Sequence, residues 1–289
     1  VKFSFRNEST ENLVLMDANN DSIQLKSLSL GVDVYHPQYS PDGSKLAFST
    51  TFEGNSHDAD LYVMDLNADS SLIKLEVDGA AIPRWRVLDN GDTVIVYVSY
   101  SGTNDNEKWN SSSTWQVPFA GGKFGTPQKL FNRAFNGGVA YDNSFAVTGA
   151  SLLMTHFAGK PDSENTILYD GAQVCNVSLA RDSSGIFAFL DASGPMGREF
   201  TGKKSYDWHE YLLLTDTTGV VIDAIKCLYG YVFADTEWLS KSGFLIGTIS
   251  ADGLRPFIVL VDVANHSVVP LMQTLRSIEV WQPDMWIEP

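Results

Sequence analysis

Cysteine, long apolar runs and basic residues are all scarce in this 289-residue sequence. Two cysteines, Cys175 and Cys227, are too few for a disulfide-built fold and too far apart to form a metal-binding pair, so we interpret them as buried thiols and leave their redox state open. No apolar run reaches the roughly 18 residues that would span a bilayer, so no transmembrane segment is predicted. The 20 Lys and Arg residues against 35 Asp and Glu give a net charge of −15 with no basic patch, which excludes a nucleic-acid partner.

Motifs of common catalytic and metal sites are also missing. The sequence contains no Gly-x-Ser-x-Gly elbow, no His-Glu-x-x-His and no phosphate-binding Gly-rich loop. The stretches 17–22 and 65–70 match half of a calcium loop, but Ser22 and Ser70 replace its glycine, so both are predicted to be hairpin turns. The histidines show no ligand spacing: His36, His57, His156, His209 and His266. We therefore predict no metal, no cofactor and no catalytic residue, and we leave open whether several blades together hold a metal at a central axis.

What the sequence does contain is a repeat. Hydrophobic residues make up 44% of the chain and aromatic residues 12%, enough for a large core. Residues 36–77 read as four short strands, with the turn Pro41-Asp42-Gly43 after the first of them. The third strand recurs six times, at 12–17, 61–65, 114–118, 166–170, 211–216 and 257–262. From Asp17 to Asp262 is 245 residues in five steps, a mean period of 49, which predicts six blades.

The chain ends extend this pattern. The segment 281–286 resembles the first strand of a blade, and Lys2-Phe3-Ser4-Phe5 resembles a second strand. We therefore predict an all-β, six-bladed propeller of four-stranded antiparallel blades, closed by a C-terminal inner strand that joins three N-terminal strands. The predicted blades are 30–77, 78–132, 133–177, 178–226, 227–274 and 275–289 with 1–29, in a single domain, 1–289. An aromatic residue recurs in the first strand (Tyr39, Trp85, Phe145 and Trp238) and is predicted to pack between blades.

The segment 36–48, followed by Asp60-Leu61-Tyr62-Val63-Met64-Asp65, resembles the TolB-like (WD-type) propeller repeat of bacteria. The chain also resembles, more faintly, a set of bacterial surface lipoproteins. The resemblance implies a periplasmic or cell-surface domain that binds a protein partner, because TolB-type propellers mostly do so, although related blades also cap the active sites of prolyl oligopeptidase-like peptidases. It transfers no functional residue, since the matching positions are structural. Because the sequence starts at Val1 without a signal-like segment, we expect a mature or trimmed domain, a monomer or a module of a larger chain.

Two long loops, 99–113 and 191–210, connect second and third strands, on the propeller face where the connections into new blades also lie. Amphipathic aromatic residues on this face predict a surface for a protein partner or a polysaccharide. The predicted ligand-binding residues are Tyr35, Trp109, Tyr206, Trp208, His209, Tyr231 and Trp281, with Tyr100 and Tyr229 on the same face. The opposing interpretation is that these rings only hold the loops in place. We predict a non-catalytic recognition or scaffold protein. The alternative is a polysaccharide lyase or glycoside hydrolase that uses acids of the inner strands, namely Asp182, Glu237 and Asp284.

Overall fold

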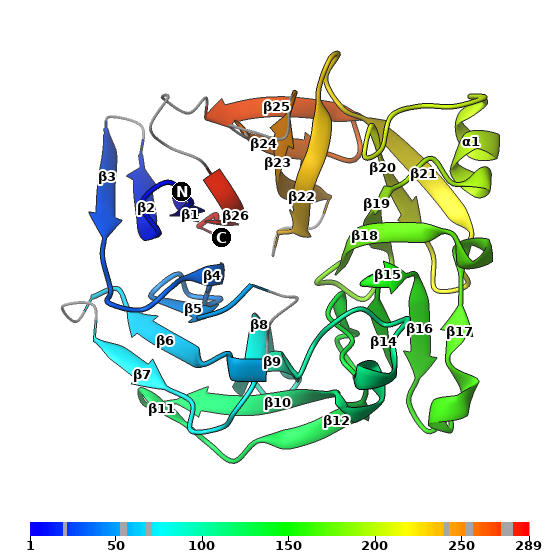
Figure 1. Ribbon diagram of the computed structural model, residues 1–289. Helices are drawn as coiled ribbons and strands as arrows, with labels where there is room; N and C mark the ends of the chain where they lie inside the picture. Colours follow the sequence, from blue (N-terminus) through cyan, green and yellow to red (C-terminus); the bar gives the residue numbers. More distant parts are fainter. Residues whose placement is uncertain are drawn as a thin grey trace. The chain divides into compact units, whose positions relative to one another are not determined.

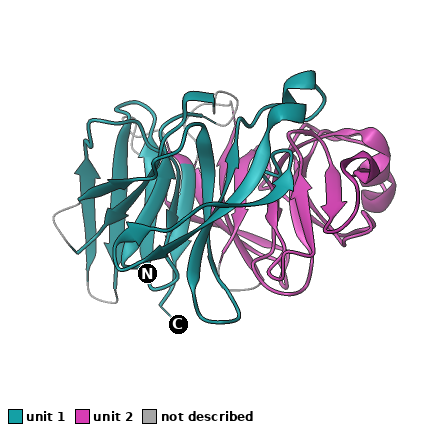
Figure 2. Cartoon of the chain, turned by 90° about the horizontal axis from the view of Figure 1, so that it is seen from below, with its two compact units in different colours: residues 1–136, 282–289 teal, residues 137–281 magenta. Residues whose placement is uncertain are grey.

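The computed structural model describes residues 1–19, 22–52, 57–67, 71–239, 243–251, 257–272 and 280–288. The chain divides into two compact units, residues 1–136 with 282–289, and residues 137–281 (Figure 2). Six antiparallel sheets follow one another along the chain (Figure 1), and they are the blades of a six-bladed β-propeller, as predicted. The single domain predicted from the repeat stays a prediction.

The first unit contains three sheets, and one of them is the predicted composite blade. Its strand order is β26 (Val280–Trp286), β1 (Lys2–Asn7), β2 (Asn12–Ala18) and β3 (Ile23–Leu28), so the C-terminal strand does pair with the N-terminal ones. The next sheet contains β4 (Tyr35–Tyr39), β5 (Lys45–Ser49), β6 (Leu61–Asp65) and β7 (Leu72–Lys74). The third contains β8 (Ala80–Val87), β9 (Thr93–Ser99), β10 (Ser113–Ala120) and β11 (Lys123–Phe124), while β12 (Gln128–Asn132) also pairs with β10. The 3₁₀ helix η2 (Glu107–Ser111) lies in the β9–β10 loop.

The second unit contains the other three sheets. One consists of β13 (Gly138–Val139), β14 (Phe145–Thr148), β16 (Met154–Phe157) and β17 (Thr166–Ile167). The next has the order β15 (Ser151–Leu152), β18 (Gln173–Leu179), β19 (Phe187–Asp191), β20 (Tyr211–Thr215) and β21 (Val221–Lys226). The last has β22 (Val232–Trp238), β23 (Phe244–Ser250), β24 (Phe257–Asp262) and β25 (Ser267–Met272). Short helices lie in the connections: η3 (Asp162–Glu164), η4 (Tyr169–Gly171) and α1 (Pro195–Thr201).

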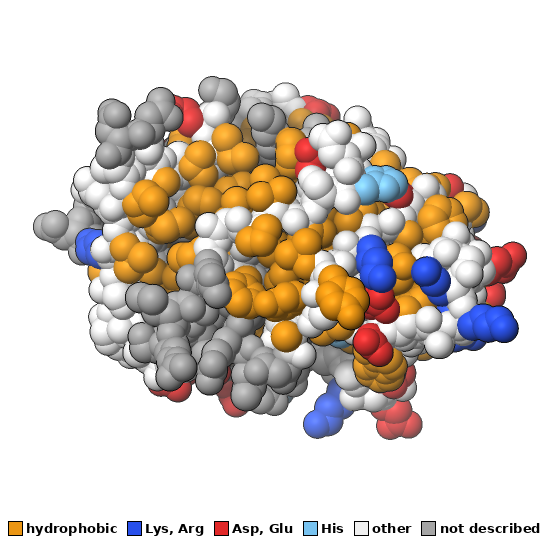
Figure 3. Space-filling model, turned by 90° about the horizontal axis from the view of Figure 1, so that it is seen from above, with side chains coloured by type: hydrophobic (Ala, Val, Ile, Leu, Met, Phe, Trp, Pro, Cys, Tyr) orange, Lys and Arg blue, Asp and Glu red, His pale blue; other side chains and the backbone are white. Residues whose placement is uncertain are grey.

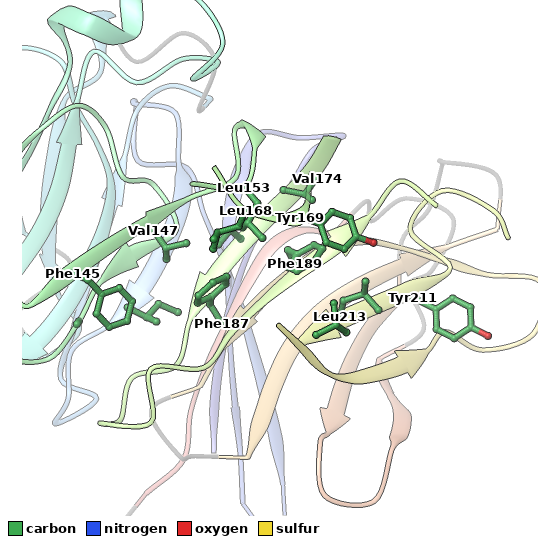
Figure 4. Close-up of a cluster of buried hydrophobic side chains, with 14 residues drawn as sticks. Phe145, Val147, Leu153, Leu168, Tyr169, Val174, Phe187, Phe189, Tyr211 and Leu213 are labelled. Carbon is green, nitrogen blue, oxygen red and sulfur yellow. The ribbon is translucent and has the colours of Figure 1, made fainter. Parts of the chain in front are cut away.

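The third blade departs from the prediction. Residues 166–170 were predicted to be its third strand, but that strand is β16, Thr166–Ile167 is the fourth strand, and the chain then leaves the sheet into η4. Phe145 lies in the second strand, not the first, and the next blade's β18 already begins at Gln173. The strands of this blade are only two to four residues long, too short to show a periodic pattern. Leu168 and Tyr169 are apolar because they enter the core of this unit (Figure 4).

The recurring aromatic residues pack between neighbouring blades, as predicted for Tyr39, Trp85 and Trp238. Trp85 is buried against strands of the preceding blade, and its indole N–H donates to the backbone oxygen of Gln38 at 3.0 Å. Its ring meets Phe119 edge to face at 5.6 Å. Burying a large apolar side chain contributes about 2–3 kcal/mol, so these contacts are a substantial part of blade stacking.

Polar side chains of the inner strands also hold the backbone of the next blade. Asp284 Oδ2 accepts from the backbone N–H of Tyr39 at 2.7 Å, and Ser178 Oγ accepts from that of Trp238 at 3.0 Å. The side-chain amide of Asn176 donates to Ala234 O at 2.7 Å. Several inner strands contain a residue in the left-handed backbone conformation, which turns the strand locally toward the next blade. These residues are His36, Ile82, Asn176 and Gln282. Blade-to-blade register is therefore fixed by hydrogen bonds as well as by apolar packing.

Both cysteines are free thiols. Cys175 lies in β18, and the pairings Cys175–Leu190, Leu190–Leu212 and Leu212–Ile225 place it three strands from β21, after which Cys227 follows. At about 4.8 Å per strand the separation is roughly 14 Å, well beyond the Cα distance of about 7 Å that a disulfide can bridge. The predicted hairpin turns at 17–22 and 65–70 lie partly outside the described residues.

Candidate functional site

The predicted ligand-binding residues are divided between the two units. Tyr35 and Trp109 belong to the first unit, and Tyr206, Trp208, His209, Tyr231 and Trp281 belong to the second. Each group is therefore described within its own unit.

Trp109 holds its loop in place instead of facing solvent. Its side chain is only 6% exposed, its ring meets Phe135 edge to face at 5.9 Å, and its indole N–H donates to Ala134 O at 3.4 Å. The guanidinium of Arg133 lies 5.7 Å from the ring centre. Trp109 is therefore shielded from solvent in this conformation, and its ligand-binding role stays a prediction.

Tyr35 is half-buried, and its ring makes a cation–π contact with Arg6. The guanidinium carbon of Arg6 lies 4.3 Å from the ring centre, and Arg6 itself is almost fully buried in β1. Arg6 Nε donates to Glu8 at 2.6 Å, while Glu11 and Asp33 lie at 3.8 and 3.7 Å. Burial tends to lower the pKa of Arg6, but the hydrogen bond to Glu8 and the charges of Glu8 and Asp33 raise it overall. Nothing in the sequence marked Arg6 as buried. Its contact gives the Tyr35 ring a structural role, and ligand binding by Tyr35 stays a prediction.

In the second unit, the β19–β20 loop is built on a buried carboxylate. Asp191 is fully buried at the end of β19 and accepts hydrogen bonds from the Tyr169 hydroxyl at 2.8 Å, from the Gly194 N–H at 3.0 Å and from the Tyr206 hydroxyl. The Gly197 N–H donates to the Tyr169 hydroxyl at 2.8 Å. Burial, together with Asp191, raises the pKa of both tyrosines. Tyr206 thus anchors the loop to Asp191, and the centre of its ring lies 4.8 Å from the centre of the Tyr211 ring.

Two glycines allow this loop to approach the tyrosines. A Cβ on Gly194 would lie 2.6 Å from the Tyr169 ring, and one on Gly197 would collide with the hydroxyls of Tyr169 and Tyr206. Pro195 starts α1, where its missing N–H has no cost. The loop that carries Trp208 and His209 is therefore preorganised by hydrogen bonds and close packing, not by chain stiffness alone.

The end of this loop and the β21–β22 connection together form an exposed aromatic patch. We call it the aromatic loop surface, and it consists of Trp208, His209, Tyr229 and Tyr231. Trp208 is 59% exposed and Tyr229 98% exposed, whereas Tyr231 is half-buried and meets Phe257 edge to face at 5.5 Å. The two segments are joined by the hydrogen bonds Phe233 N–H to His209 O at 2.9 Å and Cys227 N–H to Glu210 O at 2.8 Å. The structure thus brings three predicted residues together, with Tyr229 beside them.

His209 lies in the middle of this surface. Its Nδ1 lies 3.2 Å from the backbone oxygen of Phe233, and its Nε2 is buried without a hydrogen-bond partner. Burial lowers the pKa of His209, although the Phe233 contact and Asp191 work in the opposite direction. The lowered pKa favours the neutral form of the ring, which is tilted at 32° to Trp208.

An ion pair borders the aromatic loop surface. Lys226 Nζ lies 2.9 Å from Glu210 Oε1 and 5.9 Å from the centre of the Tyr211 ring. Partial burial tends to raise the pKa of Glu210, but the hydrogen bonds from Lys226 and from the Asp207 N–H lower it overall. In protein interfaces aromatic residues are enriched at the centre and polar groups lie at the rim, so this ion pair fits the border of such a surface.

The remaining predicted residues lie elsewhere. Trp281 is half-buried in β26, and in the described part of the chain no hydrogen bond or ring contact links it to the other predicted residues. The three acids of the enzymatic alternative each have a structural partner. Asp182 is exposed and accepts from the Ser184 N–H in a turn, Glu237 lies 3.7 Å from Arg181, and Asp284 holds Tyr39.

Metal ligands and membrane spans were also sought among the described residues. These contain no group of three or more His, Cys, Asp or Glu side chains that could hold a metal ion. None of their helices is long and apolar enough to cross a membrane.

Fold comparison places the chain among β-propellers. TolB from Acinetobacter baumannii superposes with a TM-score of 0.59 at 15% identity over 98% of this chain and 65% of that one. A putative TolB from Agrobacterium tumefaciens gives 0.56 at 14% identity, over 94% and 88% of the two chains. A chain of the nidogen/laminin complex gives 0.59 at 10% identity, over 98% and 97%. No family model and no curated protein match the sequence. At such low identity the similarity establishes the fold and leaves function to the residues.

Proposed function

We propose that this protein is a non-catalytic, extracytoplasmic recognition propeller that binds a protein partner through the aromatic loop surface. The observation that carries the proposal is the exposure of Trp208 and Tyr229 on segments that are otherwise tightly bonded. Exposed large aromatic side chains supply much of the binding energy at protein interfaces, and a fixed backbone reduces the entropy lost on binding. The structural partners of Asp182, Glu237 and Asp284 favour a non-catalytic role.

The shape of the exposed rings favours a protein over a sugar. Tyr229 is exposed on both ring faces and projects from the surface, as a side chain that enters a pocket of a partner does. A sugar instead stacks on one face of a ring that is supported from behind. Of the two most exposed rings of this surface, Trp208 has another ring, His209, beside it, so a polysaccharide is the second candidate ligand.

The test is binding by variants of the two exposed rings. Trp208→Ala and Tyr229→Ala should each weaken binding to a partner isolated from cell-envelope extract by about 2 kcal/mol, which raises Kd close to 30-fold. Tyr141→Ala is the matched control, because Tyr141 is an exposed aromatic residue of the same unit in the β13–β14 turn. Equal loss in all three variants, or in none, contradicts the site.

Two further assays separate the alternatives. Tryptophan fluorescence titrated with a polysaccharide panel would show saturable quenching, lost in Trp208→Ala, if the ligand is a sugar. Release of reducing ends or unsaturated products, abolished by Glu237→Gln or Asp182→Asn, would establish an enzyme and overturn the non-catalytic proposal.

A further inference from the structure

The outer strand of the composite blade, β3, is an unusually open sheet edge. It pairs with β2 on one side, and among the described residues no strand pairs with its other side. All six of its residues except Leu28 are exposed, including Ile23 at 70% and Leu25 at 54%. β3 is the outermost strand of its sheet in Figure 1, and Figure 3 shows apolar side chains at the surface of the molecule. Such an edge is a template for another strand.

The other outer strands that the structure describes have features that hinder pairing with another strand. β7 has three residues and β17 has two. β25 contains Pro270 and a bulge where it pairs with β24, and β21 has a bulge where it pairs with β20. In the remaining sheet the outer positions are split between β11 and β12. In contrast, β3 is six residues long, contains no proline and pairs with β2 in an unbroken register.

The backbone groups that face outward from β3 follow from its pairing. The Ala18 N–H donates to Val1 O at 2.9 Å, so Ala18 directs its backbone groups toward β1 and away from its partner Ile23. Antiparallel pairs alternate between bonded and non-bonded. Gln24 and Lys26 therefore bond to β2, and the N–H and C=O groups of Ile23, Leu25 and Ser27 point toward the open edge.

We propose that β3 pairs with β3 of a second copy of this chain, antiparallel and with Leu25 opposite Leu25 on the two-fold axis. In this register Ile23 faces Ser27 of the second copy, so the residues that point outward form bonded pairs with two hydrogen bonds each. The side chains match as well, because Leu25 meets Leu25 and Gln24 lies opposite Lys26, so no like charges face each other. This self-complementarity favours a second copy as the occupant, and the surface is distinct from the aromatic loop surface.

Charge adds a condition that can be checked. Each chain has a net charge of −15, so two copies repel each other over long range. Lys26 is the single charged side chain of β3, so the contact itself is held by backbone bonds and apolar burial. Salt shortens the Debye length from about 10 Å at 0.1 M to about 3 Å at 1 M. The dimer should therefore strengthen as salt is added, the opposite of an association held by ion pairs.

The experiment is sedimentation equilibrium of the full chain across a wide range of protein and salt concentrations. The wild type should change from 31.8 kDa toward twice that mass as concentration and salt rise. Ser27→Pro removes an outward N–H without touching a β2–β3 backbone bond and should weaken dimerisation by about tenfold or more. Its matched control, Ser27→Ala, loses the same side-chain contact with Asn12 but keeps the N–H, and should dimerise like the wild type.

Side-chain variants test the register. Leu25→Lys places two ammonium groups on the axis and should abolish the dimer, whereas Gln24→Glu creates two pairs with Lys26 and should tighten it severalfold. Val269→Lys on β25 changes a side chain that is 45% exposed at another edge and should have no effect. Circular dichroism and thermal melting verify that each variant folds. A wild type that stays monomeric at every concentration overturns the proposal, as does a dimer that persists in folded Ser27→Pro and Leu25→Lys.

Discussion

The hydroxyl of Tyr169, which lies in η4, should contribute more to stability than any single polar atom within the β19–β20 loop that it holds. It donates to the buried carboxylate of Asp191 at 2.8 Å and accepts from the Gly197 N–H at 2.8 Å. Tyr169→Phe keeps the ring contact with Phe189 but removes both hydrogen bonds. A hydrogen bond to a charged group contributes about 1.5–3 kcal/mol, and an unpaired buried N–H costs about 1–3 kcal/mol. We therefore expect Tyr169→Phe to lower the free energy of unfolding by about 3–5 kcal/mol.

Tyr206→Phe is the matched comparison. It removes one bond to the same carboxylate, but Tyr206 is partly exposed, so water can replace its hydroxyl, and the expected loss is about 1–2 kcal/mol. With an unfolding entropy of about 2.1 cal/mol/K per residue, 3 kcal/mol lowers Tm by about 5 °C if the whole chain unfolds together. The shift is about 10 °C if residues 137–281 unfold alone.

Urea titration and calorimetry of the two single variants and the double variant measure these quantities. Because both hydroxyls share Asp191, the two losses should not add. A Tyr169→Phe variant that loses less than about 1 kcal/mol, or less than Tyr206→Phe, would refute the reasoning.

Three further predictions concern other buried groups. Burial lowers the pKa of His209, so below about pH 6.5 the unfolded chain binds a proton more readily than the folded chain does. The free energy of unfolding should therefore be full above about pH 6.5 and fall as pH decreases. His209→Gln should reduce this loss, measured by urea titrations at pH 5–7. Burial raises the pKa of the Cys227 thiol to about 12, so stability should decline as pH rises above about 9, and Cys227→Ala should reduce the decline between pH 8 and 11. Gly43→Ala should lower the free energy of unfolding by about 2 kcal/mol or more, because φ is +65° and the new Cβ would lie 2.5 Å from the Trp286 ring. Gly91→Ala, where φ is +85° and the space is open, should lower it by about 1 kcal/mol. The Tm values of the two variants compare these losses.

The repeat predicted most of the fold because it appears in local patterns. The Pro41-Asp42-Gly43 turn and the third strands carry their signal within a few residues, and the half-blades at the two ends were complementary in sequence. The strands predicted for the third blade were wrong in detail, because the real strands are too short to show alternation of apolar and polar residues. Leu168 and Tyr169 looked like a strand, but tertiary contacts with Val174 and Phe189 explain their hydrophobicity.

The site was less predictable, because a ring's exposure depends on distant partners. Trp109 and Trp208 both lie in long loops among polar residues, yet Trp109 is buried against Phe135 and Trp208 is exposed. Nothing within either loop distinguishes them. Asp191 was seen only as the start of a loop, since its role depends on hydroxyls 22 and 15 residues away.

The pairing of β26 with β1 has a consequence for how the chain is made on the ribosome. Residues 1–136 and 282–289 form one unit, so the inner strand of the composite blade is synthesised only after the intervening residues 137–281. At about 5–20 residues per second, the intervening segment takes roughly 7–30 s to emerge, and during that time β1 has no inner partner. Until β26 is made, the inner edge of β1 is open to wrong pairing, and β26 completes this blade.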